Sequence, residues 1–137
     1  QMSDEEAVKD TLCSYYEAVR DQRFDDLPEL FDDAMTGISL YGSQTVIGGQ
    51  AIIELFRSMV ANWKEQGISP RMGHDREKFR VTDVQENIKL VQTRLTNFDF
   101  DDNPLSSWDC TYVMVKKDNR WLVTLGTSNN RATTSLK

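Results

Sequence analysis

The spacing of apolar residues changes character at Pro70, and this change restricts the fold more than any other feature of the sequence. Before Pro70, two long segments repeat apolar residues with the helical period, and only a short stretch between them has the pattern of strands. After Pro70 no helical period returns, and long runs rich in β-branched and aromatic residues are divided by turn-forming residues. Leading helices and a later run of long strands predict an α+β domain, with the helices covering one face of the sheet.

The first helix is predicted over about residues 4–21. Ser3 and Glu6 have the S-x-x-E spacing of a capping box, which satisfies backbone N–H groups at a helix start. Apolar residues then recur at helical intervals, so the helix has one face for the core. This stripe consists of Val8, Leu12, Tyr15, Tyr16 and Val19.

Two further helices are predicted before Pro70. A short one follows over 24–31, where Pro28 is tolerated near a helix start. The strongest helical pattern begins at Gln50 and stops before Gly67, a residue suited to a helix C-cap. Its apolar stripe consists of Ile52, Ile53, Phe56, Met59, Val60 and Trp63.

Strands are predicted in two groups. Two short strands lie between Met35 and Ile47, around a turn at Gly42-Ser43. The long strands after Pro70 are sequential and antiparallel, and Asp118-Asn119 supplies the tight turn between the last two. They are predicted over residues 72–84, 88–100, 107–117 and 121–129. No repeat or linker interrupts the pattern, so the chain of 137 residues is read as one domain.

Charge and composition restrict the partners. The net charge of −6, with Lys and Arg scattered, argues against nucleic acid and against an anionic membrane surface as partners. No apolar run approaches the roughly 20 residues of a membrane-spanning helix. The acidic start differs from a signal peptide, so the cytoplasm is the expected location.

No cofactor or metal is predicted. Cys13 and Cys110 are far apart and lack the spacing of a zinc site, so both are expected to be reduced and mostly buried. The acidic stretch Asp99–Asn103 resembles a calcium loop, but Pro104 stands where the loop needs glycine. Phosphate-binding and dinucleotide-binding motifs are likewise absent from the sequence.

Several short segments carry a resemblance to a known superfamily. The segments are Tyr15–Val19, Leu30–Ala34, Gly48–Ile52, Thr111–Met114 and Asp118–Trp121. Together with the order of the elements, they make residues 5–129 resemble the nuclear transport factor 2-like superfamily, which includes ketosteroid isomerases, SnoaL-like cyclases, scytalone dehydratase and limonene epoxide hydrolase. The resemblance implies a cone-shaped cystatin-like roll, in which helices close over a strongly curved, mixed, mainly antiparallel sheet. It also implies a homodimer formed by the outer sheet faces.

The resemblance to steroid isomerases implies a role for Tyr15 but supplies no base. Tyr15 matches the oxyanion tyrosine of the first helix. The carboxylate base of those enzymes would fall near Gly37 to Ser39, where this chain has no acidic residue. Isomerisation by that route is therefore not expected, and Tyr15 is read first as a core residue whose hydroxyl reaches the pocket.

Three other residues are candidate catalytic groups. Arg94 occupies the place of an arginine in epoxide-hydrolase-like relatives, where Thr96 replaces the expected carboxylate and Asp109 could serve instead. A structural ion pair or a solvated sheet face is the alternative for Arg94 and Asp109. His74, the single histidine, has a side chain suited to proton transfer near neutral pH. A structural or rim position is the alternative for His74.

The inward face of the strand over 88–100 is left open by the sequence. Gln92, Arg94, Thr96 and Phe98 share one face, whereas Val91, Thr93 and Leu95 share the other. If the first set faces the interior, its hydrogen-bond donors combine with aromatic residues from other elements. Together they would form an apolar pocket with few oriented polar groups, as suits a small organic ligand. The candidate pocket residues are Tyr15, Tyr41, Trp63, Gln92, Thr96, Phe98, Trp108 and Tyr112.

Two functions are compatible with these observations. The first is a domain that binds a small apolar organic molecule, either without catalysis or as a cofactor-free isomerase, cyclase, dehydratase or hydrolase. The alternative is a non-catalytic dimeric module of the same fold that serves protein partners. The fold alone does not decide between them.

Overall fold

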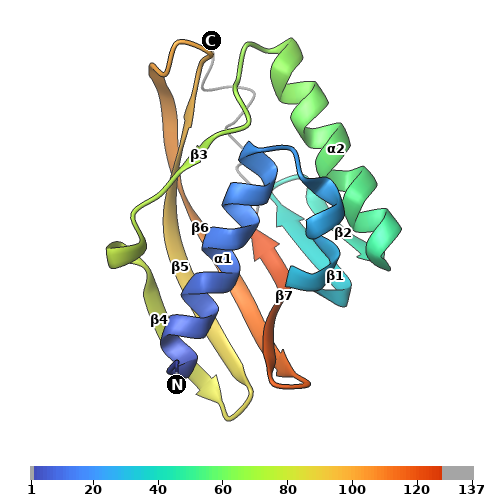
Figure 1. Ribbon diagram of the computed structural model, residues 1–137, viewed down its shortest axis with the longest axis vertical. Helices are drawn as coiled ribbons and strands as arrows, with labels where there is room; N and C mark the ends of the chain where they lie inside the picture. The colour runs from blue at the N-terminus through green and yellow to red at the C-terminus, as the bar shows by residue number, and fades with distance from the viewer. Residues whose placement is uncertain (1, 128–137) are drawn as a thin grey trace.

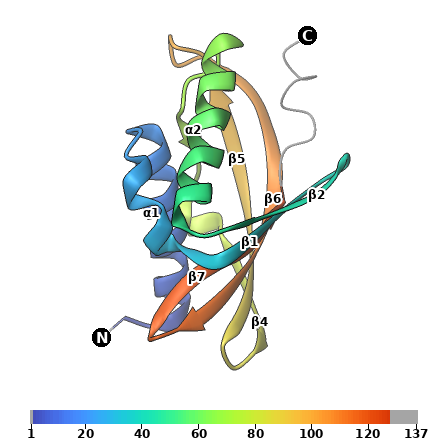
Figure 2. The same ribbon diagram turned by 90° about the vertical axis from the view of Figure 1, so that its right-hand side faces the viewer.

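Two helices and a curved sheet form two layers in the computed structural model of the protein, which describes residues 2–127 (Figure 1). The helices α1 (Asp4–Arg20) and α2 (Gly49–Glu65) lie on the same side of the sheet (Figure 2). The predicted α+β class is confirmed. Within the described residues, no helix is long and apolar enough to cross a membrane.

Both long helices form where the apolar stripes predict them. The hydroxyl oxygen of Ser3 accepts a 3.2 Å hydrogen bond from the backbone N–H of Glu6, which caps α1 as expected. At the end of α2, Gly67 has a φ of 77°, a left-handed conformation that glycine adopts without a steric penalty. The buried residues of α2 are Ile52, Phe56 and Val60, which belong to its predicted stripe.

The prediction of one continuous short helix over 24–31 is wrong. Two single 3-10 turns, Phe24–Asp26 and Pro28–Leu30, occupy that segment instead. Pro28 has no backbone N–H to donate, so an α-helical hydrogen-bond ladder cannot run through this position. The chain then enters strand β1 (Phe31–Ser39), which starts earlier than the predicted strand at Met35.

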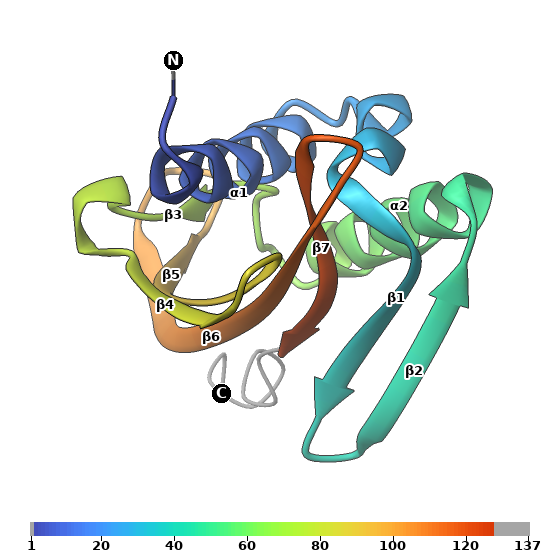
Figure 3. The same cartoon turned by 90° about the horizontal axis from the view of Figure 1, so that it is seen from below.

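Within residues 2–127, the sheet has seven strands in the order β2-β1-β7-β6-β5-β3, and β4 also pairs with β5. Among these described strands, β1 and β7 pair parallel, and the other pairings are antiparallel. A mixed, mainly antiparallel sheet is therefore confirmed, and Figure 3 shows its curvature. The remaining bounds are β2 Gly42–Ile47, β3 Met72–Gly73, β4 Arg80–Gln85, β5 Ile88–Phe98, β6 Pro104–Lys117 and β7 Arg120–Thr127.

The single strand predicted over 72–84 is broken into β3 and β4 by a 3-10 turn at Arg76–Lys78. Both pieces pair with β5, where Gly73 faces Thr96 and Arg80 faces Gln92. Between these two pairs, this segment advances by seven residues (73 to 80), whereas β5 advances by four (96 to 92). The additional residues of the segment must therefore leave the sheet. The predicted strand 121–129 ends at Thr127, and its last two positions lie outside the described residues.

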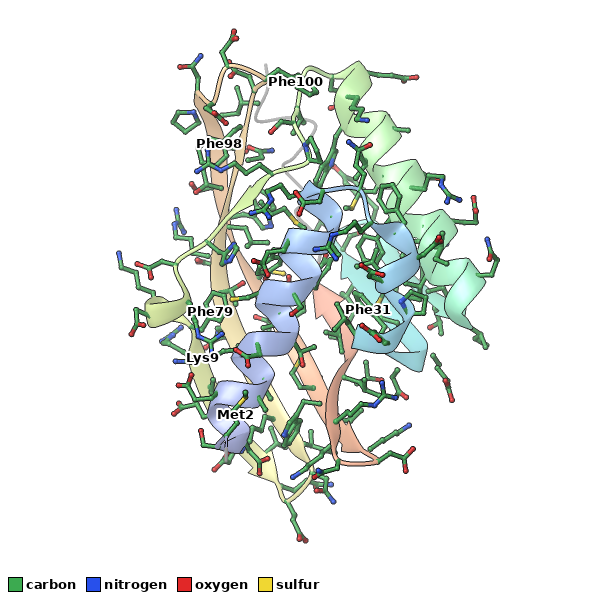
Figure 4. All side chains as sticks on the ribbon, viewed as in Figure 1. Met2, Lys9, Phe31, Phe79, Phe98 and Phe100 are labelled. Atoms are coloured by element: carbon green, nitrogen blue, oxygen red, sulfur yellow. The ribbon has the colours of Figure 1, made fainter. Side chains whose placement is uncertain are left out.

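One hydrophobic core lies between the helices and the concave face of the sheet. Leu12 and Val8 of α1 and Met114 of β6 are fully buried in it. Phe31 and Phe79 lie on opposite sides of α1 (Figure 4), and both belong to this core. The core does not fill the whole interior, because a cavity lies between α2 and the sheet.

Candidate ligand cavity

A cavity of about 510 Å³ lies between α2 and the concave face of the sheet. Its volume is within the range of pockets that hold small organic ligands. Leu55, Phe56, Met59 and Trp63 form the wall from α2, because these positions share one face of the helix. The sheet supplies the opposite wall with Phe31, Met35, Val46, Met72, Leu95, Trp108, Cys110, Tyr112, Val123, Gly126 and Thr127.

The β1–β2 hairpin forms another side of the cavity. Gly37 and Ser39 of β1, Tyr41 of the turn and Gln44 of β2 line it. An added Cβ at Gly37 would meet no atom within 4 Å, so this glycine leaves open space where a side chain could project. The cavity is thus enlarged at the positions where steroid-isomerase-like relatives are expected to carry the base.

The cavity lining is apolar and uncharged. Among the described residues that line it, none is Asp, Glu, Lys, Arg or His. Its polar groups are hydroxyls, one thiol, the indole N–H groups of Trp63 and Trp108, the amide of Gln44 and backbone. A cavity of this kind offers hydrogen bonds without offering a counter-ion.

Buried hydroxyl groups form a chain beside the cavity. The hydroxyl of Tyr16 donates a 2.8 Å hydrogen bond to the hydroxyl oxygen of Tyr112, and it also lies 3.3 Å from Oγ1 of Thr93. Tyr15 stands next to this chain, with its ring centroid 4.9 Å from that of Tyr16. Because the proton of Tyr16 is already committed to Tyr112, the buried phenols of the lining that can donate to a group in the cavity are Tyr15 and Tyr112.

Burial raises the pKa of all three phenols above the ordinary value, because the phenolate would lose its hydration in this environment. Tyr15, Tyr16 and Tyr112 are therefore protonated at neutral pH and act as hydrogen-bond donors. Burial likewise raises the pKa of the Cys110 thiol. That thiol donates to the carbonyl oxygen of Thr127 at 3.0 Å, so Cys110 has a structural role rather than that of a nucleophile.

The structure places five of the predicted pocket residues on the cavity lining: Tyr15, Tyr41, Trp63, Trp108 and Tyr112. Gln92, Thr96 and Phe98 do not line it, so their predicted place in the pocket is wrong. The inward face of β5 carries the other set, with Val91, Thr93 and Leu95 buried. Phe98 lies at the end of the sheet near Phe100 (Figure 4), and the guanidinium of Arg71 covers its ring at 3.8 Å.

Arg94 and Asp109 form an ion pair on the outer face of the sheet. They are opposite each other on β5 and β6, with Nη1 of Arg94 3.0 Å from Oδ1 of Asp109. Both side chains are largely exposed, at 63% and 82%. The sheet separates them from the cavity. The structure therefore agrees with the alternative of a solvated sheet face, and Arg94 and Asp109 do not face the pocket as a catalytic pair would.

His74 is exposed and also lies outside the cavity. Its Nδ1 is 2.8 Å from the carbonyl oxygen of Met72, so Nδ1 carries the proton of this hydrogen bond. Its ring packs against that of Tyr16 in a tilted arrangement, with a centroid distance of 4.7 Å and an interplanar angle of 48°. His74 lines a separate hollow of about 150 Å³ with Glu17, Arg20 and Arg71. The structure therefore agrees with the alternative of a rim position, and His74 does not contact the main cavity.

Sequence reasoning missed several features of the site. The glycine at Gly37 and the methionines Met35, Met59 and Met72 line the cavity but carry no motif. The sequence places Tyr16 in the core but does not show that it holds Tyr112 in place. Met59 could have been found from its helical spacing, because it lies four positions before the predicted pocket residue Trp63 on the same stripe of α2.

This combination of helices over a strongly bent mixed sheet, with an apolar cavity beneath them, defines an α+β protein of cystatin-like fold. A family model described as "NTF2-like protein (DUF6841)" matches residues 4–131. The chain therefore belongs to this NTF2-like family, as the sequence resemblance implied. No curated protein matches the chain in sequence.

Solved structures of similar fold come from several bacteria. A protein of unknown function with a cystatin-like fold from Nostoc punctiforme has a TM-score of 0.74 at 13% identity, covering 90% of this chain and 88% of that one. An NTF2-like protein from Novosphingobium aromaticivorans has a TM-score of 0.72 at 14% identity, with coverages of 98% and 89%. A ketosteroid isomerase-like protein from Erwinia carotovora atroseptica has a TM-score of 0.66 at 10% identity, with coverages of 93% and 95%. At these identities the similarity shows the fold alone.

Proposed function

We propose that this protein binds a small, uncharged, largely apolar organic molecule in the cavity beneath α2. The observation that carries the proposal is the lining itself: about 510 Å³ bounded by aromatic, aliphatic and thioether side chains, with Tyr15 and Tyr112 as buried hydroxyl donors. A ligand with an apolar body and one hydrogen-bond acceptor matches this arrangement.

The absence of charge from the lining selects against ionised ligands. A carboxylate or ammonium group that enters an apolar cavity loses its hydration, and without a counter-ion this loss is not repaid. A neutral carbonyl or ether oxygen loses much less hydration free energy on entering the cavity, and it gains a hydrogen bond from a phenol. We therefore expect discrimination between molecules that share one carbon skeleton and differ by a charged group.

Binding is better supported than acid–base catalysis. His74, Arg94 and Asp109, the candidate catalytic residues, lie outside the cavity. The phenols that reach it have raised pKa values and remain protonated, so they are poor bases at neutral pH. In this proposal their hydroxyls orient the ligand.

We also propose, as the family resemblance implies, that two copies associate through the outer faces of their sheets. No described helix covers that face (Figure 3). Its centre carries half-buried aliphatic residues, among them Val113 and Val115 of β6 and Leu125 of β7. Apolar side chains in the middle of an uncovered sheet face favour burial against a second sheet.

The binding proposal is tested with a matched pair of fluorescent probes, N-phenyl-naphthylamine and its sulfonated analogue. The neutral probe is expected to bind one per chain with saturation and to quench Trp63 or Trp108, which line the cavity. The sulfonated probe, with the same skeleton and one negative charge, is expected to bind at least about tenfold more weakly, which corresponds to about 1.4 kcal/mol.

A blocking variant shows where the probe binds. Gly37→Leu places a side chain in the open space of the cavity, and Ala34→Leu adds the same side chain to the same strand at an exposed position. The first variant should lose binding of the neutral probe, and the second should retain it. Equal binding by both variants, with thermal unfolding unchanged, would place the ligand elsewhere.

A further inference from the structure

A long uncharged segment covers one border of the molecule. Residues 34–53 contain no Asp, Glu, Lys, Arg or His, although 28% of the chain is charged and about six charges would be expected in 20 residues. This segment forms most of β1, all of β2 and the start of α2. The rest of the surface is acidic on balance, since the chain has a net charge of −6.

Strand β2 lies at the end of the sheet order, and within residues 2–127 it pairs only with β1. Strand β1 pairs with β7 on its other side, so β2 forms the border of the sheet and one of its edges faces outward (Figure 3). Strands in this position usually carry a lysine, another charge, a proline or a bulge that prevents pairing with another chain. β2 has none of these, and its register with β1 is regular from Ala34 to Ser39.

The hydrogen-bond pattern identifies the backbone groups at this free border. The N–H of Gly48 donates to the carbonyl oxygen of Asp33 at 2.8 Å. In an antiparallel pair, bonded and non-bonded positions alternate, so Val46 and Gln44 also bond to β1. The N–H and C=O groups of Ser43, Thr45 and Ile47 then point to the free border. The 2.8 Å contact between Oγ1 of Thr36 and Oγ1 of Thr45 agrees, because side chains are closest at non-bonded positions.

We propose that β2 pairs antiparallel with β2 of a second copy of this chain, with Thr45 at the two-fold axis. Ser43, Thr45 and Ile47 of one copy then face Ile47, Thr45 and Ser43 of the other, and each facing pair exchanges both backbone hydrogen bonds. The side chain of Ile47, which is 75% exposed, becomes covered by its cross-strand neighbours.

Charge is the reason for choosing a second copy as the occupant. Two molecules of charge −6 repel each other wherever acidic surfaces meet, and the uncharged border of β2 is a place where they approach without opposed carboxylates. The pairing surface is also self-complementary, because an antiparallel strand presents the same donors and acceptors to its own copy. This contact uses a strand edge and is distinct from the outer sheet faces.

The experiment measures the mass of the full chain in solution by light scattering. Thr45→Lys adds a charge at the proposed axis, and Thr82→Lys makes the same change at an exposed threonine of β4, the border strand at the other end of the sheet. We expect Thr45→Lys to halve the mass of the wild-type assembly and Thr82→Lys to leave it unchanged. A monomeric wild type, or an equal mass for wild type and Thr45→Lys, would overturn the proposal.

A crosslinking variant tests the register independently. At a bonded antiparallel position the two Cα atoms are about 5.5 Å apart, which lies within the range that a disulfide spans. Thr45→Cys is therefore expected to form a covalent dimer under mild oxidation, whereas Thr82→Cys and the wild type, with Cys13 and Cys110, should not. Failure of Thr45→Cys to crosslink, with its fold intact by circular dichroism, would refute this pairing and would leave the ligand cavity unaffected.

Discussion

The hydroxyl of Tyr16 donates a 2.8 Å hydrogen bond to the hydroxyl of Tyr112, and this bond ties α1 to β6 beside the cavity. The two residues are 96 positions apart in the sequence. Both side chains are almost completely buried, with 1% of Tyr16 and 4% of Tyr112 exposed. The bond therefore holds Tyr112 on the cavity lining and contributes to the stability of the fold.

Replacing Tyr16 by phenylalanine should destabilise the protein without changing its shape. Tyr16→Phe leaves the hydroxyls of Tyr112 and Thr93 without this partner in a buried environment, which costs about 1–3 kcal/mol in the free energy of unfolding. Denaturant unfolding measures the change. Tyr41→Phe, at a tyrosine that is 79% exposed, is the matched control and should be neutral. Equal stabilities of the two variants would contradict the structural role of the bond.

Acid should weaken the attachment of the start of α1 to the sheet. The carboxylate of Asp4 accepts hydrogen bonds of 3.0 Å from Nε1 of Trp121 and from Nζ of Lys116, and these bonds lower the pKa of Asp4 below its ordinary value of 3.8. A pKa that is lower in the folded state contributes stability above the unfolded-state value. That contribution is lost as the pH falls through the folded-state pKa.

The Asp4→Asn variant isolates this contribution. It should be less stable than wild type at neutral pH, and the difference should shrink as the pH falls below 3.8. Asp118→Asn, in the β6–β7 turn, is the control, since Asp118 forms no ion pair within residues 2–127. A difference that stays constant from neutral pH to pH 2 would show that the charge of Asp4 is not responsible.

Two methionines should respond differently to truncation because one lies in the packed core and the other lines the cavity. Met114 is fully buried, and Met114→Ala should cost about 2–5 kcal/mol in the free energy of unfolding, because it creates a new void. Met59 is half-buried and lines the existing cavity, so Met59→Ala should cost clearly less. It should weaken binding of the neutral probe instead. Equal costs for the two variants would indicate that the cavity is filled in solution.

The sequence was sufficient for the main elements because their apolar patterns are local. The stripe Ile52, Phe56 and Val60 predicted α2, and the turn at Asp118-Asn119 predicted the last hairpin. The broken strand was not predictable in this way. Between its two points of pairing with β5, this segment has more residues than β5 has, so part of it must leave the sheet. That excess depends on pairing between residues far apart in the sequence.

The inward face of β5 was not predictable for a similar reason. Both faces contain polar residues, and the buried one includes Thr93 and Asn97. The hydroxyl of Thr93 lies within hydrogen-bond distance of Tyr16, and the side-chain oxygen of Asn97 accepts from the backbone N–H and the hydroxyl of Ser106. Nδ2 of Asn97 is buried without a hydrogen-bond partner among the described residues. Alternation finds a strand, but only such tertiary partners decide which side faces the core.

The opposite faces of β6 provide a last test with adjacent residues. Trp108 lines the cavity, whereas Asp109 points to the outer face and pairs there with Arg94. Trp108→Ala should weaken binding of the neutral probe, because it removes part of the apolar wall. Asp109→Ala and Arg94→Ala should leave the probe affinity unchanged and alter the free energy of unfolding by less than about 1 kcal/mol, as exposed ion pairs do. If Arg94→Ala weakened binding as much as Trp108→Ala, the ion pair would have to communicate with the cavity through the sheet, and the functional separation of the two faces would be wrong.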